Sequence, residues 1–394
     1  MSYSVQNIRN VCLLGHGGNG KTSLAESMLY LTGGTVRLGN PADGNTVCDY
    51  DPEETRRQIS ISTAVAPVEY NGCKINVLDT PGYFDFSGEV IEALQVADAA
   101  IIVCSAKDGI SVGLEKAWRY CEERDMPRFI YISKTDEENS DYNATFDALR
   151  ERFGNKIAPI VVPIWDDNKK VTGIIDVLNK RAYEMQNGKR VEIELPEGKE
   201  DVVTQFNDAL KESVAETSEE FMDRYFNGDE FSEDEIRQAL RVNVMDGSIV
   251  PVLMGSNPLA RGMYTLMADI VKYFPSPDKR SCNGIAQKTN EIFEANYDFT
   301  KVKSAYVWKT IADPFLGKYS LIKVCSGVIK SDDTLLNVEK GEEERLNKLY
   351  VLEGSKPIEV PELHAGDIGA IAKLNSVQTG DSLATKANPI LYPK

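Results

Sequence analysis

Gly15-His16-Gly17-Gly18-Asn19-Gly20-Lys21-Thr22 lies near the start of this 394-residue sequence and matches the pattern G-x-x-x-x-G-K-[ST]. Glycines let such a loop curl so that successive backbone N–H groups point at phosphates, and the N-terminus of the following helix adds a favourable dipole. In this pattern Lys21 reaches the β- and γ-phosphates of a nucleotide, and the Thr22 hydroxyl binds magnesium. The alternative is an accidental glycine turn, which average residue frequencies produce in roughly one chain of this length in a hundred.

The sequence on either side of the loop has the order that phosphate binding requires. Residues 8 to 14 predict a short buried strand, and residues 21 to 31 predict a helix. Further strand-like runs, separated by helical patterns, lie at 74–79, 99–106, 128–133 and 249–256. Continuous apolar strands that alternate with helices are typical of a mostly parallel sheet with helices on both faces. We therefore predict an α/β P-loop domain.

A second motif, Asp79-Thr80-Pro81-Gly82, follows the strand-like run at 74–79. A carboxylate at the end of a buried strand is well placed to hold a magnesium-bound water, and Gly82 lets its backbone N–H approach the γ-phosphate. Alone, Asp-x-Pro-Gly is also an ordinary turn. Behind a phosphate-binding loop, it predicts the magnesium and γ-phosphate side of the site.

The third motif, Ser133-Lys134-Thr135-Asp136, ends another apolar strand. Asp136 can accept hydrogen bonds from guanine N1–H and N2–H, and a site built to pair those donors rejects adenine. The Lys134 stem can pack on the base, and the stretch 255–257 can supply backbone N–H groups to the guanine O6. The predicted nucleotide-binding residues are Gly15, His16, Gly17, Gly18, Asn19, Gly20, Lys21, Thr22, Ser23, Asp79, Thr80, Pro81, Gly82, Ser133, Lys134, Thr135, Asp136, Gly255, Ser256 and Asn257.

The rest of the chain divides into an insert and a second domain. Residues 158 to about 250 interrupt the alternation with a small β segment and two acidic helical stretches, at about 198–227 and 232–246. Beyond about residue 300, short strands alternate with turn signals, which predicts an antiparallel β-barrel. We therefore predict a GTP-binding domain at 1–280 with an inserted α/β subdomain at about 158–250, a linker at 281–299 and a β-barrel domain at 300–394.

Composition narrows the classes of partner. The formal net charge is -17, whereas phosphate-tracking surfaces need clustered Lys and Arg, so we expect no binding to free DNA. The seven cysteines are scattered without a Cys-x-x-Cys pair, which favours reduced thiols over a zinc site or a disulfide framework. No segment approaches the ~20 apolar residues of a membrane helix, and the N-terminus lacks a signal-peptide core. These features predict a cytoplasmic protein.

In their order, these motifs resemble elongation factor G and its relatives. The resemblance includes the segment DYDPEETRRQISIS (49–62), the continuation YFDFSGEV (83–90) and, in the second domain, IADPFLGKYSLIKVCSGVIKSDDTLLN (311–337), HAGDIGAI (364–371) and TGDSL (379–383). It covers nearly the whole chain. Full-length relatives continue into three more domains that reach into the ribosome, so we expect this chain to be the first two domains of a longer factor.

The resemblance implies a monomeric GTPase of translation that uses GTP, GDP and magnesium. Thr22 and Ser60 would ligate the magnesium, and Asp79 would hold it through a water. The acidic helices of the insert are either a solvated face or a site that recruits the ribosomal stalk protein, as the insert does in relatives. His16 and His364 are expected to have structural roles.

Four departures from the family pattern bear on catalysis. Tyr83 stands where relatives usually have the His that orients the attacking water, and a neutral phenol can still hydrogen-bond that water. Ser60 replaces the usual Thr but keeps its hydroxyl. Gly18 replaces an Asp that helps hold a cation, and Gly17 replaces a bulky apolar residue, which we expect to make room for the Tyr83 ring. Ser133 replaces an Asn that braces the phosphate-binding loop.

The expected catalytic residues are Tyr83, Lys21 and Gly82. Basal hydrolysis should be slow, because the sequence shows no arginine placed to act within the chain and relatives depend on the ribosome. Two other functions stay open. Tyr83 could have abolished catalysis and left a non-hydrolysing guanine-nucleotide switch. The chain could also belong to a ribosomal protection factor of the tetracycline-resistance type, although those relatives keep the His at this position.

Overall fold

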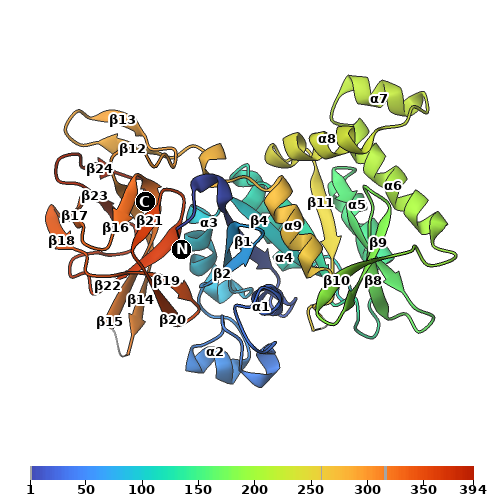
Figure 1. Cartoon of the computed structure of the whole chain (residues 1–394), viewed down its shortest axis with the longest axis horizontal. Helices are drawn as coiled ribbons and strands as arrows, with labels where there is room; N and C mark the ends of the chain where they lie inside the picture. Colours follow the sequence, from blue (N-terminus) through green and yellow to red (C-terminus); the bar gives the residue numbers. More distant parts are fainter. Residues whose placement is uncertain (1, 259, 315–316) are drawn as a thin grey trace.

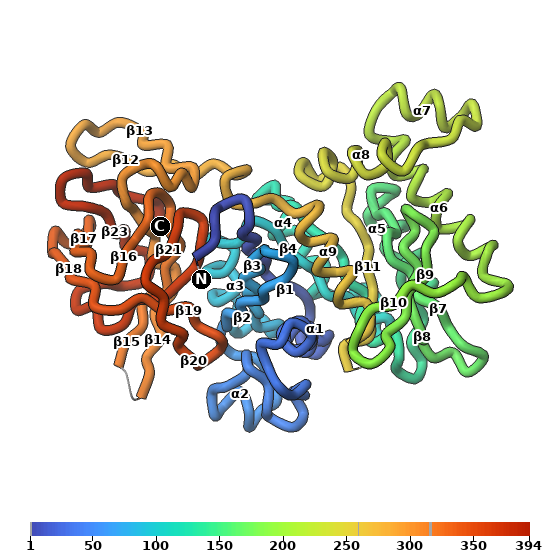
Figure 2. Tube along the Cα trace, in the orientation of Figure 1, coloured from blue at the N-terminus to red at the C-terminus, as the bar shows by residue number. Residues whose placement is uncertain are grey.

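The computed structural model describes residues 2–258, 260–314 and 317–394. Its three parts lie in a row, with the second domain and the insert on opposite sides of the first domain's main sheet (Figure 1). The tube in Figure 2 shows the chain leaving the central domain for the insert, returning through one strand and one helix, and then crossing to the second domain. No helix within these described ranges is long and apolar enough to cross a bilayer.

The central domain is built on a seven-stranded sheet. In order across the sheet, the strands are β2 (Ala64–Tyr70), β3 (Cys73–Asp79), β1 (Ile8–Gly15), β4 (Ala99–Ser105), β5 (Arg128–Ser133), β11 (Val250–Met254) and β6 (Ile157–Pro159). β2 is antiparallel to β3, and the remaining neighbours pair in parallel. Every residue of β3, β4, β5 and β11 is buried, which is why these strands read as continuous apolar runs.

Helices cover this sheet, and α1 begins directly after the phosphate-binding loop. The helices are α1 (Lys21–Leu31), α2 (Pro52–Arg57), α3 (Ser87–Val96), α4 (Val112–Glu123), α5 (Tyr142–Phe153) and α9 (Met263–Tyr273). Short 3₁₀ turns lie at Val5–Asn7, Pro41–Asp43, Phe84–Phe86 and Pro277–Lys279. In α2, Asp51 and Glu54 form a reciprocal capping box, which fixes the start of this short helix.

The insert has a separate four-stranded sheet in the order β10 (Lys189–Ile193), β9 (Arg181–Gln186), β8 (Val171–Asp176) and β7 (Val161–Trp165). Since β6 pairs with β11, the stretch around residue 158 is the edge of the main sheet, and the separate sheet starts at Val161. Three helices follow, α6 (Glu200–Ala215), α7 (Glu219–Phe226) and α8 (Glu233–Met245). The helical stretch expected at about 198–227 is two helices, because Ser218 caps a new one.

The second domain is antiparallel, as its sequence pattern predicted. Its main sheet runs β18 (Glu342–Arg345), β17 (Thr334–Asn337), β23 (Ser382–Ala384), β14 (Ser304–Asp313), β15 (Gly317–Ser326), β22 (Ile368–Ala372), β19 (Leu349–Glu353) and β20 (Lys356–Val360). β16 (Val328–Lys330) pairs with β21 (Glu362–His364). Phe315 and Leu316, within the family-like segment 311–337, lie outside the described residues.

The segment expected to be a linker is more ordered than its composition indicated. Residues 281–299 contain the hairpin of β12 (Asn283–Ala286) and β13 (Glu291–Glu294), and β12 also pairs with β24 (Ile390–Leu391) near the end of the chain. We predicted a connection here from the sequence, whereas the pairing of this stretch with β24 is a contact between distant segments that local composition does not reveal.

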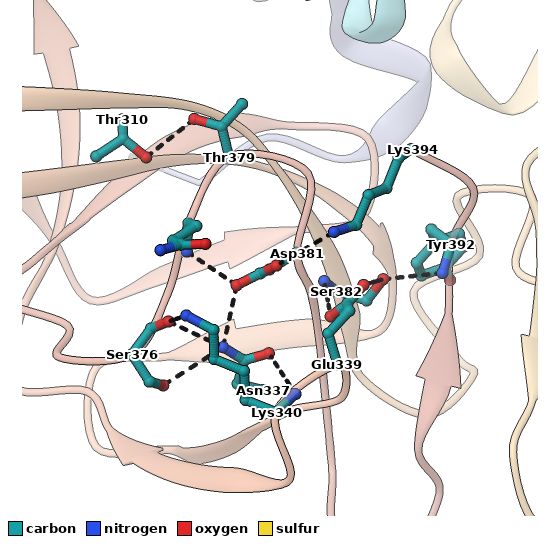
Figure 3. Close-up of polar contacts among 11 residues, drawn as sticks. Thr310, Asn337, Glu339, Lys340, Ser376, Thr379, Asp381, Ser382, Tyr392 and Lys394 are labelled. Atoms are coloured by element: carbon teal, nitrogen blue, oxygen red, sulfur yellow. Dashed lines mark hydrogen bonds and ion pairs between the residues drawn. The ribbon is translucent and has the colours of Figure 1, made fainter.

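A polar network holds one corner of the second domain (Figure 3). Asp381, buried in the turn before β23, accepts from the Asn337 side chain at 3.1 Å. Glu339 accepts from the backbone N–H of Ser382 at 2.7 Å, and the Ser382 hydroxyl accepts from the backbone N–H of Tyr392 at 2.8 Å. The family-like stretch TGDSL therefore connects β17, β23 and the end of the chain, which is a structural role.

The two domains share a buried polar interface. Lys74 of β3 pairs with Asp367 of the second domain at 3.0 Å, with both side chains no more than 5% exposed. Lys323 of β15 pairs with Asp98 of the first domain at 2.9 Å, with both side chains 3% exposed. Asn10 links the two pairs, because its amide donates to Asp98 and to a second-domain carbonyl and accepts from the Asn76 amide, which also donates to Asp367. These four buried charges therefore lie at the interface as two ion pairs.

We predict that Lys323→Met lowers the free energy of unfolding by about 3–5 kcal/mol, because it leaves the Asp98 carboxylate buried without its charge partner. Urea denaturation measures the loss. Lys348→Met is the matched control, since Lys348 pairs with Glu359 at the surface, with the two side chains 57% and 60% exposed. That control should cost under about 1 kcal/mol. Equal losses in the two variants would contradict the prediction.

Candidate nucleotide-binding site

The predicted motifs meet at one edge of the main sheet, because they follow the carboxyl ends of parallel strands. β1 lies between β3 and β4, so the strand order reverses there, and ligands of open α/β sheets bind at such points. A cleft of about 370 Å³ opens at this edge. It is lined by Gly17, Gly18, Gly20, Lys21, Thr22, Ser23, Asn40, Pro41, Ala42, Asp49, Gln58, Ile59, Ser60, Gly82, Tyr83 and Lys134.

The phosphate-binding loop is packed closely against the second motif. A Cβ atom on Gly82 would lie 2.5 Å from the Gly17 Cα and 2.6 Å from the Lys21 Nζ, so this approach requires glycine at position 82. The Lys21 ammonium donates to the carbonyls of Gly15 at 3.0 Å and His16 at 3.1 Å. It is therefore held at the loop by contacts that phosphate oxygens can replace.

The three residues predicted to hold magnesium are in contact with one another. The Thr22 hydroxyl donates to Asp79 Oδ2 at 2.7 Å and lies 2.9 Å from the Ser60 hydroxyl. Ser60 in turn donates to Asp49 Oδ1 at 2.6 Å. With both hydroxyls donating to carboxylates, neither has a proton left for the contact between Thr22 and Ser60. Asp49 was not among the predicted site residues, although it opens the family-like segment 49–62.

These residues suit magnesium. Hydroxyl and carboxylate oxygens are its preferred protein ligands, and it keeps several waters. In the described part of the chain, no group of three or more His, Cys, Asp or Glu side chains is arranged to hold a metal by itself. A magnesium ion here would rest on Thr22, Ser60 and phosphate oxygens, with Asp79 acting through water. Asp79 Oδ1 is buried without a hydrogen-bond partner among the described residues, which leaves an acceptor for such a water.

Burial of several charges in this small volume shifts their protonation. Burial, followed by the neighbouring Asp49 carboxylate, raises the pKa of Asp79 to about 7. Burial likewise raises the pKa of Glu54 to about 7 and raises the pKa of Asp49. Burial lowers the pKa of Lys21 to about 8. The cluster therefore holds protons that a divalent cation would displace.

On the guanine side, Asp136 Oδ1 is buried and has no hydrogen-bond partner among the described residues. An unpaired buried carboxylate oxygen is costly, and guanine N–H donors would satisfy it. Thr135 braces this loop by donating from its hydroxyl to the Gly255 carbonyl at 3.1 Å. One expectation needs correction: the Ser256 N–H donates to the Arg261 carbonyl at 3.1 Å and is not free for guanine O6. The loop closes on itself through this bridge, which local sequence does not show.

Tyr83 lies against the phosphate-binding loop, as we expected from the glycine at position 17. A Cβ atom on Gly17 would lie 2.8 Å from Cε2 and Cζ of the Tyr83 ring. The ring is 44% exposed and lines the cleft, so its hydroxyl can reach solvent at the edge of the phosphate site. Any larger residue at position 17 would displace it.

The two histidines have local contacts that suit structural roles. A Cβ atom on Gly113 would lie 2.6 Å from the His16 Cα, so the loop packs directly on the start of α4. His364 Nε2 lies 3.1 Å from Glu362 Oε1 within the second domain.

Residues outside the predicted motifs close the cleft from the other side. Asn40, Pro41 and Ala42 line it together with Gln58, whose side-chain amide donates to the Ala42 carbonyl at 2.9 Å. Gln58 adopts a left-handed backbone with φ of 58°, so it turns the chain directly after α2. Glutamine seldom adopts this conformation, so its presence in the sequence did not predict a turn here. A glycine at this position would have indicated one.

The fold and the site together define a P-loop GTPase domain followed by an antiparallel β domain. Residues 6–276 match the elongation factor Tu GTP-binding domain, and residues 303–386 match elongation factor G domain 2. A solved structure from Thermus thermophilus is similar with a TM-score of 0.84 and 34% sequence identity, covering 96% of this chain and 54% of that chain. The chain belongs to the family of translational GTPases related to elongation factor G. It spans about half the length of the solved structure that it matches.

The raised pKa values of Asp79 and Glu54 predict how stability depends on pH without nucleotide or magnesium. Between the ordinary carboxyl pKa of about 4 and the folded value of about 7, the folded protein binds more protons than the unfolded chain. This contribution to stability is therefore present at low pH and lost as pH rises through 7. The pKa of Lys21 is lowered to about 8, so Lys21 contributes to the pH dependence of stability only above this range.

Asp49→Asn removes the charge that raises both neighbouring pKa values, so the fall in unfolding free energy from pH 5 to pH 8 should shrink by about 1 kcal/mol. Urea unfolding at the two pH values measures it. Asp43→Asn, which removes an exposed carboxylate of the same loop, is the control. An unchanged pH dependence in Asp49→Asn would show that the three carboxyl groups do not interact.

Proposed function

We propose that this chain is the nucleotide-binding part of a translation factor that hydrolyses GTP and couples hydrolysis to a conformational step on the ribosome. The observation that carries the proposal is the cluster of buried charges and unpaired polar atoms at one cleft. An anion would stabilise the charged form of Lys21, a cation would stabilise those of Asp79 and Asp49, and hydrogen-bond donors would satisfy Asp136. GTP with magnesium supplies the anion, the cation and the donors. Hydrolysis then leaves GDP as the product.

In the proposed reaction, a water oxygen attacks the γ-phosphorus and the bond from phosphorus to the bridging oxygen of GDP breaks. The Lys21 ammonium moves from the Gly15 and His16 carbonyls to the β- and γ-phosphate oxygens. The Gly82 N–H donates to a γ-phosphate oxygen, and the water loses its proton to phosphate or solvent. When bound, magnesium neutralises charge on the phosphate oxygens. Tyr83 hydrogen-bonds the attacking water at the edge of the cleft and orients it.

Lys309 of β14 supports coupling between the nucleotide and the second domain. Its ammonium donates to the Thr63 carbonyl at 3.0 Å, to the Ser62 hydroxyl and to the Glu89 carboxylate. Ser62 and Thr63 follow the Ser60 segment, and Glu89 lies on α3, which follows the Gly82 segment. The register of β14 against β15 shifts between Val307 and Lys309. Both γ-phosphate-contacting segments are therefore tied to one side chain of the second domain.

The proposed partner is the ribosome, and the proposed location is the cytoplasm. The acidic insert offers a docking surface for the stalk protein, because α7 and α8 expose Phe226 (78% exposed) and Val242 (53% exposed) among carboxylates. Apolar side chains within an acidic face suit a partner with basic and apolar groups. We propose that the protein acts as a monomer.

We predict that Lys309→Met lowers ribosome-stimulated GTP turnover by roughly tenfold, because coupling between sites is typically worth about 1–3 kcal/mol. Affinity for GTP should change much less. Lys303→Met is the control, since Lys303 pairs with Asp333 within the second domain at 2.6 Å and touches neither nucleotide segment. Equal loss of turnover in both variants would point to general damage of the second domain and contradict the coupling role.

The proposed function is tested by GTP turnover of the full-length protein with and without ribosomes, at matched magnesium and potassium. We expect slow turnover alone, strong stimulation by ribosomes, and a loss of roughly a hundredfold in Tyr83→Phe, which lacks the orienting hydroxyl. GTP that stays bound and unhydrolysed with ribosomes would identify a non-hydrolysing switch. Release of tetracycline from ribosomes, dependent on GTP, would instead identify a protection factor.

A further inference from the structure

Gly20 is the last glycine of the phosphate-binding loop. It lies between the side chain of Asn257, which follows β11, and that of Ser133, which ends β5. A Cβ atom on Gly20 would lie 3.1 Å from Asn257 Nδ2 and 4.0 Å from Ser133 Cβ. The Asn257 amide donates to the Gly20 carbonyl at 3.0 Å, and the Ser133 hydroxyl donates to the Asn19 carbonyl at 2.6 Å. We propose that Asn257 is a positioning residue that, together with Ser133, sets the direction of the backbone donors that hold the phosphates.

The direction of these donors follows from peptide geometry. In a planar trans peptide the C=O and the N–H point in opposite directions. A clamp on the Asn19 carbonyl therefore fixes the Gly20 N–H, and a clamp on the Gly20 carbonyl fixes the Lys21 N–H. Gly20 needs this support, because it has φ of 99° and ψ of 24°, a left-handed conformation that caps α1. Two consecutive N–H groups are thus aimed by two side chains outside the loop.

Tyr131 determines which way the Asn257 amide faces. The Tyr131 hydroxyl donates to Asn257 Oδ1 at 2.8 Å. Burial raises the pKa of Tyr131 well above its usual range, so this hydroxyl keeps its proton and remains a donor. The amide oxygen is then paired with Tyr131, and the NH₂ group is left to face Gly20. The hydroxyl needs Gly255 to reach this position, since a Cβ atom there would lie 2.6 Å from it.

The backbone of Asn257 is anchored as well as its side chain. The Asn257 carbonyl accepts from the Ser27 hydroxyl of α1 at 2.8 Å and from the Ala260 N–H at 3.1 Å. The residue is 5% exposed. Asn257 therefore joins the end of β11, the end of β5 and α1 around the phosphate-binding loop, and it cannot turn away without breaking several buried hydrogen bonds.

This arrangement accounts for the serine at position 133. Where relatives have Asn, a side-chain amide of the base-recognition motif braces the loop, whereas Ser133 offers one short hydroxyl. That hydroxyl still reaches Asn19, and Asn257 supplies the amide from the neighbouring loop. The inference rests on the proposed nucleotide site and adds to it a residue whose role is mechanical. Asn257 acts through its side chain on the loop, and not only through a backbone N–H to guanine O6.

The test is the dissociation rate of a fluorescent GDP analogue from purified protein with magnesium. Asn257→Ala should speed dissociation roughly five- to tenfold, since it removes a buried hydrogen bond and loosens the donors that depend on it. Asn257→Asp has a side chain of the same shape but no donor toward the Gly20 carbonyl. The analogue should dissociate from it at least as fast as from Asn257→Ala. Tyr131→Phe should act in the same direction, and its combination with Asn257→Ala should be no faster than Asn257→Ala alone.

Asn207→Ala is the matched control, because Asn207 is also buried (3% exposed) and donates from its amide to a carbonyl, that of Val177, at 3.1 Å in the insert. It should lower the unfolding midpoint by a similar amount and leave dissociation unchanged. Wild-type dissociation in Asn257→Ala, or equal acceleration in Asn207→Ala, would overturn the positioning role while leaving the proposed function intact. Failure of the wild-type protein to bind the analogue would overturn both.

Discussion

Charge buried at the carboxyl ends of β1 and β3 is the constraint on which the site depends. Lys21, Asp79 and Asp49 lie close together, and burial disfavours the charged form of each. The Lys21 ammonium is folded back onto the carbonyls of Gly15 and His16. An anion beside Lys21 and a cation beside the two carboxyl groups would stabilise the charged forms that burial disfavours.

Glycine gives this burial its geometry. Gly82 lies so close to Gly17 and Lys21 that no side chain fits between them, and Gly17 leaves its own space to Tyr83. The position of the Tyr83 ring therefore depends on glycine at position 17. The ring lies against the loop at the edge of the cleft.

Sequence predicted the parts of the fold that short-range patterns specify. The strand that ends at Asp79 and the strand that precedes Asp136 are fully buried and mostly apolar, so their motifs could be placed at one sheet edge. What escaped prediction depends on distant partners. Asp49 belongs to the site through its contact with Ser60, and the Ser256 N–H is taken by a bridge within its loop. The hairpin at 281–299 exists because a strand near the chain's end pairs with it.

The buried pairs between the two domains have a consequence for how such proteins can be recombined. Lys74 and Asp98 face partners more than two hundred residues further along the chain. A crossover in the segment 281–299 that joined this first domain to another relative's second domain would strand both charges unless the incoming domain brought matching groups. The segment between the domains is therefore a poor place to exchange their parts, because each buried charge of the first domain depends on a partner in the second.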